Sequence, residues 1–346
     1  MNGRKIKNME EFAEVSGISR PTVSKYFNNP DSVRNSTRER IERALEKYDY
    51  RPNIFAMNQN RRLTKNVGVV VPYLADPFFA EIARSIERRC MTAGFFPLLF
   101  SSHGAPEQER AILDSLRSLK PAGVLLAALG RSSDLKHIES FCAEVPTVLF
   151  DSYLENVGEA FVGSDNSQFV RMMVDYLCRS GEPPVFFEMA NPANPNARRR
   201  RKGFTDTMEM LGHEPVIIQA EGEGWDFEEI GYRGGLRAIE QRKLVSNTVL
   251  CSNDRLALGL IAAAYEKGMR VGRGQGCALR IAGMDDHPFA RFTCPPLTTI
   301  AQSYASISER SIEALFEVLE RDGDVGPSDQ RVDTLFEGQL VMRESA

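Results

Sequence analysis

The sequence predicts an N-terminal all-α domain of the helix-turn-helix type, followed by a larger α/β body of two doubly wound lobes with parallel sheets. Two short amphipathic segments joined around Gly17 predict the helical domain. Apolar runs that alternate with helical patterns from Val67 onward predict the body. Residues 1–65 hold 14 Lys and Arg against 8 Asp and Glu, a net charge of +6, and the whole chain carries −4, which leaves −10 for the body.

Three helical patterns make up the N-terminal domain. The second begins after Ser19, which can cap it, and Pro21 falls in its first turn, where a missing N–H costs little. The third runs over 36–48, and Ser36 and Glu39 have the spacing of a capping box. Apolar side chains from all three are expected to form a small core: Phe12, Val15, Val23, Phe27, Ile41, Leu45 and Tyr48.

The second helix leaves a polar face free of this core. Arg20, Thr22, Ser24 and Lys25 are expected to point outward, and these residue types bond to base edges and phosphates when such a helix lies in a major groove. The alternative is a helical hairpin with a solvated polar face. A basic domain on an acidic body favours the nucleic-acid interpretation.

Composition excludes several other classes. At 346 residues, two or three domains are expected. No apolar run approaches the about 18 residues of a membrane span, and the polar N-terminus lacks a signal-peptide apolar region, so we expect a cytoplasmic protein without membrane contact. The six cysteines and four histidines are scattered without C-x-x-C pairs, so we expect reduced thiols, no metal site and no cofactor.

The body shows two series of apolar runs. The rhythm of the first series restarts after about residue 163. The expected strands are 67–71, 97–100, 123–127 and 147–150 in the first lobe, and 185–187, 216–218, 248–251 and 281–284 in the second. Ligands of doubly wound sheets bind beyond the carboxyl ends of the strands, so a cleft between the lobes is the expected ligand site.

Polar and aromatic residues gather at these strand ends. They are Asp76, Phe78, Phe79, Asp151, the basic run 198–202, Trp225, Asn253, Asp254, Asp285 and Asp286. Aromatic faces stack on rings, and carboxylates, amides and a guanidinium fix hydroxyls or anions. Each residue also has a structural alternative: Phe79 as core, Asp76 or Asp254 as a helix cap, and Trp225 as packing under a loop.

The motifs taken together resemble the lac repressor/GalR family of bacterial transcriptional regulators over nearly all of residues 8–342. The resemblance rests on these stretches: Gly17-Ile18-Ser19, Thr22-Val23-Ser24, Asn28, Thr37-Arg38-Glu39, Tyr50-Arg51-Pro52-Asn53, Asp76-Pro77-Phe78-Phe79, Asn253-Asp254, Ala257-Leu258-Gly259, Gly283-Met284-Asp285-Asp286 and Pro295-Pro296-Leu297-Thr298-Thr299-Ile300. Each is weak alone, whereas all of them in this order are highly specific.

This resemblance implies a domain organisation and partners. It implies a helix-turn-helix domain over 1–51, a hinge helix and linker over 52–65, and a periplasmic-binding-protein-like effector and dimerisation domain over 66–342. The N-lobe would comprise about 66–163 plus 295–330, and the C-lobe about 164–294. The partners implied are a pseudo-palindromic double-stranded DNA operator and a second copy of the chain. No apolar heptad follows Leu340-Val341-Met342, which favours a dimer over a tetramer.

The resemblance also assigns site residues. Arg20, Pro21 and Lys25 occupy the positions that usually read bases. Gln59 stands where the family commonly carries a leucine that wedges into the minor groove. Either Met57 or Phe55 would take the place of this leucine, or the operator would bend less. The implied DNA contacts are Ser19, Arg20, Pro21, Thr22, Ser24, Lys25, Asn28, Asn53, Phe55, Ala56, Met57 and Gln59. The implied effector contacts are Asp76, Phe78, Phe79, Asp151, Arg200, Trp225, Asn253 and Asp285.

The predicted function is that of a sequence-specific transcriptional regulator, expected to be a repressor, controlled by a small molecule between the lobes. Acidic and amide residues outnumber cations among the candidate contacts, which favours a sugar or sugar derivative. The alternative is a carbohydrate-binding protein without a DNA role, against which the basic domain and the lack of an export signal argue. An enzyme is not expected, because the sequence has no phosphate loop, no nucleophile elbow and no plausible carboxylate–histidine arrangement.

Overall fold

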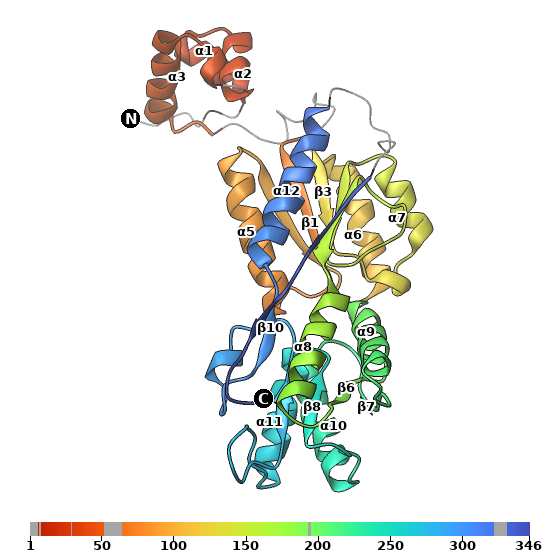
Figure 1. The fold of residues 1–346 in the computed structure, drawn as a ribbon. Helices are drawn as coiled ribbons and strands as arrows, with labels where there is room; N and C mark the ends of the chain where they lie inside the picture. The colour runs from red at the N-terminus through yellow and green to blue at the C-terminus, as the bar shows by residue number, and fades with distance from the viewer. Residues whose placement is uncertain (1–5, 7, 29, 52–63, 193–194, 322–330) are drawn as a thin grey trace. The chain divides into compact units, whose positions relative to one another are not determined.

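The structure is a computed structural model that describes every residue except 1–5, 7, 29, 52–63, 193–194 and 322–330. The chain forms two compact units, Met1–Thr64 and Lys65–Ala346, which we call the head and the body (Figure 1). Each is described by itself.

The head is helical, as predicted. Its elements are α1 (Met9–Ser16), α2 (Arg20–Asn28), the 3-10 helix η1 (Pro30–Ser32) and α3 (Asn35–Tyr48). The Asn8 side chain accepts hydrogen bonds from the N–H groups of Glu10 and Glu11 at 3.1 and 2.9 Å and caps α1. Gly17, at φ +64°, ends α1 in the left-handed conformation that favours glycine, which gives the sharp turn into α2.

The head core differs in part from the predicted one. Its buried members are Phe12, Ile18, Val23, Ile41, Ala44 and Tyr50. Tyr50 stacks on Phe12 with ring centroids 4.6 Å apart, although it was not among the expected core residues. Val15, predicted to be core, is 44% exposed. The capping box was also wrong: α3 begins at Asn35, Arg34 occupies the N-cap position without a side-chain bond, and Ser36 lies inside the helix.

The N-lobe of the body contains a parallel sheet with the strand order β11-β5-β4-β3-β1-β2. The strands are β1 (Asn66–Val71), β2 (Phe96–Ser101), β3 (Gly123–Leu126), β4 (Thr147–Phe150), β5 (Ala160–Ser164) and β11 (Val332–Phe336). The helices are α5 (Pro77–Thr92), α6 (Pro106–Leu119), α7 (Leu135–Cys142) and α12 (Tyr304–Glu320), with the 3-10 helix η2 at Gly130–Ser132.

Alternate side chains of β1 pack on opposite faces of this sheet. Val69 and Val71 join the cluster that contains residues of α5 and α12, and Val70 joins the cluster that contains residues of α6 and α7. Figure 1 shows the two helix pairs on the two sides of the sheet. A strand that is buried on both faces has a continuous run of apolar residues, so the apolar run 67–71 predicted β1.

The C-lobe contains a second parallel sheet, with the order β7-β6-β8-β9. Its strands are β6 (Val185–Met189), β7 (Ile217–Ala220), β8 (Thr248–Cys251) and β9 (Arg280–Ala282). Its helices are α8 (Asn166–Ser180), α9 (Asn196–Met210), α10 (Phe227–Glu240) and α11 (Asp254–Glu266), with the 3-10 helix η3 at Ala290–Phe292. Strands β10 (Thr299–Ala301) and β12 (Gln339–Val341) form an antiparallel pair. The predicted fold class is therefore confirmed.

Three crossings connect the lobes. The chain passes from β5 to α8, from β10 to α12, and from β11 to β12. Strand β11 belongs to the N-lobe sheet although it begins after residue 330, where the sequence analysis ended that lobe. The last residues also fold with the C-lobe, because Ser345 donates to the Ile281 carbonyl at 2.5 Å, so the body continues past residue 342.

The described residues include no helix long and apolar enough to cross a bilayer. Within the same part of the chain, no group of three or more His, Cys, Asp or Glu is arranged to hold a metal ion. The six cysteines are free thiols.

Candidate DNA-binding helix and effector cleft

Helix α2 presents a buried and an exposed face. Val23 is fully buried in the head core, whereas Arg20, Pro21 and Lys25 are exposed. The Ser19 and Thr22 hydroxyls lie 2.7 Å apart at the start of the helix. The residues of the exposed face are therefore free to meet a partner, as the sequence predicted.

The remaining predicted DNA contacts differ in how far the structure describes them. Thr22 and Ser24 are partly exposed on α2. The side chain of Asn28 lies outside the described part of the chain, as do Asn53, Phe55, Ala56, Met57 and Gln59. These assignments stay predictions.

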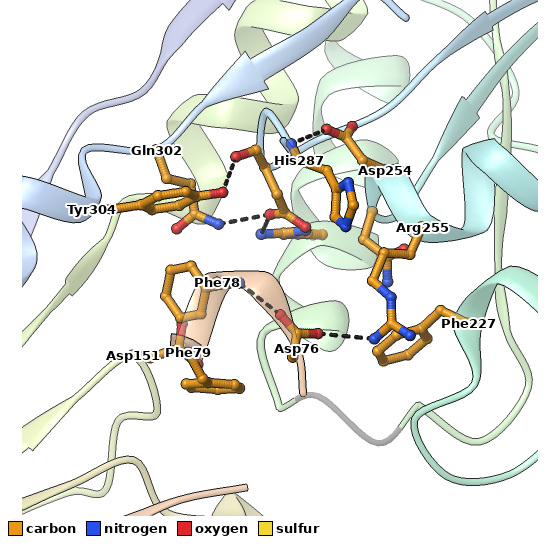
Figure 2. Close-up of a pocket in the computed structure, with 13 residues that line it drawn as sticks. Asp76, Phe78, Phe79, Asp151, Phe227, Asp254, Arg255, His287, Gln302 and Tyr304 are labelled. Atoms are coloured by element: carbon orange, nitrogen blue, oxygen red, sulfur yellow. Dashed lines mark hydrogen bonds and ion pairs between the residues drawn. The ribbon is translucent and has the colours of Figure 1, made fainter. Parts of the chain in front are cut away.

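A narrow pocket lies in the cleft between the lobes, with about 480 Å³ of empty space when the part open to solvent is included (Figure 2). Predicted effector contacts that line it are Asp76, Phe78, Phe79, Asp151, Arg200, Asn253 and Asp285. The sequence analysis did not include the other lining residues among the effector contacts: Phe227, Asp254, Arg255, His287, Gln302 and Tyr304. The strand ends of both sheets thus converge on one site, as the doubly wound fold requires.

Arg200 organises the C-lobe side of the pocket. Its guanidinium donates to Asn166 Oδ1 at 2.7 Å, to the Ser252 carbonyl at 2.6 Å and to Asp285 Oδ1 at 2.6 Å. Only 4% of Arg200 is exposed. A guanidinium with three partners at these distances is held rigidly and is already neutralised by Asp285.

Asp285 connects Arg200 to the crossing between β10 and α12. Its Oδ1 also accepts from Gln302 Nε2 at 2.6 Å, and Gln302 Oε1 accepts from the Ser164 hydroxyl at 2.7 Å. The Tyr304 hydroxyl donates to the Asp285 carbonyl (Figure 2). One hydrogen-bonded chain therefore runs from the pocket to two of the three crossings between the lobes.

Arg255 bridges the two lobes on the opposite side of the pocket. Its guanidinium bonds Glu228 through two nitrogens at 2.7 and 2.6 Å and Asp76 Oδ2 at 3.0 Å. It also lies over the Phe227 ring, 5.0 Å from the centroid (Figure 2). Helices α10 and α11 pack closely here because residue 259 is a glycine. A Cβ at this position would come within 2.1 Å of the Glu228 carbonyl oxygen.

Asp76 is a helix cap and also lies in the pocket lining, so its role as an effector contact stays a prediction. It caps α5 by accepting from the Phe78 N–H at 2.9 Å, and it lines the pocket. Burial raises its pKa although Arg255 beside it favours the carboxylate. The adjacent Phe78 ring meets Tyr304 edge to face, with centroids 5.3 Å apart, and forms an aromatic wall.

Asp151 forms the second bridge between the lobes. Its Oδ1 and its carbonyl accept from Asn196 Nδ2 at 2.9 and 3.1 Å. Burial raises the pKa of this carboxyl to about 7, against the opposing effect of Arg200. Asp151 lies at φ +59° and Asp285 at φ +128°, backbone conformations that are rare outside glycine and that often mark functional sites.

Asn253, and not Asp254, is the cap of α11, and both residues line the pocket. Asn253 is the cap of α11 and accepts from the Leu256 N–H at 2.8 Å, while it also lines the pocket. Asp254 is fully buried and accepts from the His287 N–H at 2.7 Å and the Thr299 hydroxyl at 2.6 Å. Burial raises its pKa to about 8, although the hydrogen bonds from Thr299 and His287 favour the carboxylate.

Trp225 does not line the pocket. It stacks on Tyr73 of the N-lobe with centroids 5.9 Å apart and contacts Phe79 and Phe227, both of which do line it. The predicted contact thus lies in a layer behind the pocket wall, close to the alternative of packing under a loop. Phe227, two residues further along, provides an aromatic face in its place.

Residues missed by the sequence analysis had partial signals. Arg255 and His287 directly follow the motifs at 253–254 and 285–286, and Phe227 follows Trp225. Gln302 and Tyr304 follow β10, which pairs with β12 and belongs to neither main sheet. The alternation of strands and helices therefore did not predict a strand end at this point.

The comparisons with known proteins agree with this architecture. Residues 8–53 match the family of bacterial regulatory proteins of the lacI type, and residues 174–346 match the periplasmic binding protein-like domain. The HTH-type transcriptional repressor PurR of Mannheimia succiniciproducens is 28% identical over 348 residues, which cover 98% of each chain.

Solved structures show the same fold. The Lac repressor bound to ONPG in the repressed state has a TM-score of 0.82 at 23% identity, over 99% of this chain and 100% of that one. A periplasmic binding protein/LacI transcriptional regulator from Alkaliphilus metalliredigens, complexed with D-xylulofuranose, has a TM-score of 0.67 at 23% identity, over 82% and 99%.

The head and the body match the two parts of one kind of protein, in the same order. The relative is named as a transcriptional repressor, which is the role that the sequence predicted for this chain. The chain belongs to the lacI family of bacterial regulatory proteins and is a DNA-binding transcriptional repressor.

Proposed function

We propose that this repressor binds an uncharged, hydroxyl-rich small molecule, a sugar or sugar derivative, in the cleft pocket, and that the bound molecule changes operator affinity. The proposal rests on the observation that both guanidinium groups of the pocket already form ion pairs. Arg200 is paired with Asp285, and Arg255 with Asp76 and Glu228. Neither is free for an anion, whereas carboxyl and amide groups beside aromatic rings suit hydroxyls and sugar faces.

A neighbour of the same fold supports the choice of ligand class. The Alkaliphilus metalliredigens regulator is complexed with D-xylulofuranose. At 23% identity this supports the class of ligand and not its identity.

The signal is proposed to pass through lobe closure. Both Arg255–Asp76 and Asn196–Asp151 join the lobes, so a ligand that reinforces or breaks them shifts the lobe angle. In a homodimer on a pseudo-palindromic operator, this shift changes how the two N-lobes meet and whether the 52–60 segments fold into paired helices on DNA. An isolated helix of this length is only marginally stable, so both DNA binding and effector binding can shift its folding equilibrium.

Ligand binding is testable through Trp225, the single tryptophan of the chain. Because it stacks on Tyr73 across the lobes, its emission is expected to change when a ligand alters closure. Purified protein is titrated with ribose, xylulose, glucose and polyols, and with nucleosides and free nucleobases, and melting temperature is followed in parallel. Phe227→Ala is expected to weaken the response about tenfold or more, because it removes a stacking face.

The matched control for that titration is Phe292→Ala. Phe292 is 71% exposed and does not line the pocket, so this variant should respond as the natural protein does. A response to nucleobases alone, or equal responses of the two variants, would contradict the sugar assignment.

DNA recognition is testable at Lys25. Lys25→Ala is expected to weaken operator binding by roughly 1–3 kcal/mol if the side chain reads a base, measured by fluorescence anisotropy at fixed salt. Lys47, exposed on α3, is the matched control and should lose less when changed to alanine. Equal operator affinity of Lys25→Ala and the natural protein would show that Lys25 does not read a base.

A further inference from the structure

His287 lines the cleft pocket on the segment between β9 and η3. The two residues before it, Asp285 and Asp286, lie at φ +128° and φ +51°. The His287 N–H donates to Asp254 Oδ2 at 2.7 Å, and the Asp286 N–H donates to the Thr299 hydroxyl at 3.2 Å. These hydrogen bonds hold the backbone of the segment, so the His287 side chain has a fixed starting point in the pocket wall.

A hydrogen bond to the His287 ring determines which nitrogen carries the hydrogen. Nδ1 accepts from the Phe289 N–H at 3.1 Å, so Nδ1 has no hydrogen of its own. In the neutral ring the hydrogen is therefore on Nε2, which makes Nε2 a donor. Nε2 makes no hydrogen bond to any residue that the structure describes, yet it is not one of the fully buried atoms without a partner. It is therefore accessible from the pocket that the residue lines.

The surroundings of the His287 ring favour its neutral form. Burial lowers the pKa of this imidazole, and only 7% of the residue is exposed. The carboxylates of Glu228 and Asp285 oppose this shift, and the guanidinium of Arg255, beside which the ring lies in Figure 2, adds to it. A second proton would also have to bind Nδ1, which already accepts from the Phe289 N–H. The ring therefore offers the pocket an uncharged N–H donor.

Most other side-chain donors of the pocket lining already have an acceptor within the protein: Arg200, Arg255, Gln302 and Tyr304. Asn253 uses its Oδ1 to cap α11, and its Nδ2 makes no hydrogen bond to a described residue. The described lining thus leaves two uncharged donors for a ligand, Asn253 Nδ2 and His287 Nε2. A buried donor without an acceptor costs free energy, so a ligand oxygen that meets it gains affinity.

We propose that His287 is a specificity-determining residue of the cleft pocket, whose Nε2–H donates a hydrogen bond to an oxygen of the bound sugar. This inference rests on the proposed function, because it takes a sugar as the occupant of the pocket. The carboxylates of the lining can accept only from ligand hydroxyls, whereas His287 can meet any acceptor oxygen: a hydroxyl, a ring ether or a carbonyl. A molecule without an oxygen at this place leaves the N–H unpaired and is disfavoured.

Two substitutions separate ligand binding from support of the backbone. His287→Asn keeps an acceptor near the Nδ1 position for the Phe289 N–H, but it has no donor at the Nε2 position. His287→Gln carries an amide N–H that reaches the Nε2 position, but it has no acceptor at the Nδ1 position. We expect His287→Asn to keep the natural melting temperature and to bind sugar about tenfold more weakly, the effect of one lost hydrogen bond. We expect His287→Gln to melt at a lower temperature and to bind sugar more tightly than His287→Asn does.

The full chain is titrated with ribose, xylulose and glucose as probes, and affinity is measured by calorimetry and by Trp225 emission. His213→Asn changes a histidine that does not line the pocket and should bind as the natural protein does. If none of the three sugars binds the natural protein, the proposed function fails and this inference fails with it. If a sugar binds the natural protein and His287→Asn equally well, or binds His287→Gln more weakly than His287→Asn, this inference alone is overturned.

Discussion

Arg200→Ala is expected to lower the free energy of unfolding of the body by about 3–5 kcal/mol, because it breaks a buried ion pair by removing one partner. The substitution removes the guanidinium donor from Asn166, the Ser252 carbonyl and Asp285, and Asp285 keeps only its hydrogen bond from Gln302, in a largely buried site. For a domain of this size the melting temperature should fall by roughly 10 °C.

The same variant should abolish the response to a cleft ligand. Arg200 bonds Asp285, and Asp285 bonds Gln302 at the crossing, so the loss of Arg200 disconnects the pocket from the segments about which lobe closure is proposed to occur. Operator binding without ligand should be retained, because the head is a separate compact unit. Thermal denaturation and operator titration with and without ligand measure these effects.

Arg171→Ala provides the matched control. Arg171 is exposed on α8, and its loss should change stability by less than about 0.5 kcal/mol. Arg200→Lys keeps a charge without the planar fork and should fall between the two. A natural melting temperature in Arg200→Ala would show that the three hydrogen bonds do not hold the C-lobe.

Much of the body could be predicted because its strands are buried on both faces. The run 67–71 gives β1 for this reason, and the rule that ligands bind beyond strand ends located the pocket. What the pattern could not give is which side chains pair. Arg200 was expected to contact the ligand, which stays a prediction because it lines the pocket, but its hydrogen bonds to groups that are 34 to 85 residues away in the chain could not be predicted.

Local patterns also misplaced helix boundaries and core positions in the head. Ser36 and Glu39 satisfy a capping box in sequence, yet the Arg34 carbonyl already accepts from the N–H groups of Thr37 and Arg38 at 2.9 and 3.0 Å, so the helix starts one residue earlier. Tyr50 comes from beyond the last helical pattern and fills the place beside Phe12. A periodicity search within helices cannot find such a residue.

Phe12→Ala is expected to unfold the head and to reduce operator affinity at least about 100-fold. Truncating a fully buried phenylalanine costs about 3–5 kcal/mol, and the core of so small a domain supplies about the same amount. Phe12 is fully buried and contacts Tyr50 and Phe27, so the loss leaves a cavity that rings on both sides cannot close. Anisotropy titration measures operator binding, and Trp225 emission checks that the body is intact.

Val15→Ala distinguishes this structure from the core that the sequence suggested. Val15 and Phe12 lie on the same helix and were both expected to be core, yet Val15 is 44% exposed. Its truncation should change stability by less than about 0.5 kcal/mol and leave operator affinity intact. Comparable losses in the two variants would mean that α1 packs with a different face inward, since only a rotated helix could bury both side chains.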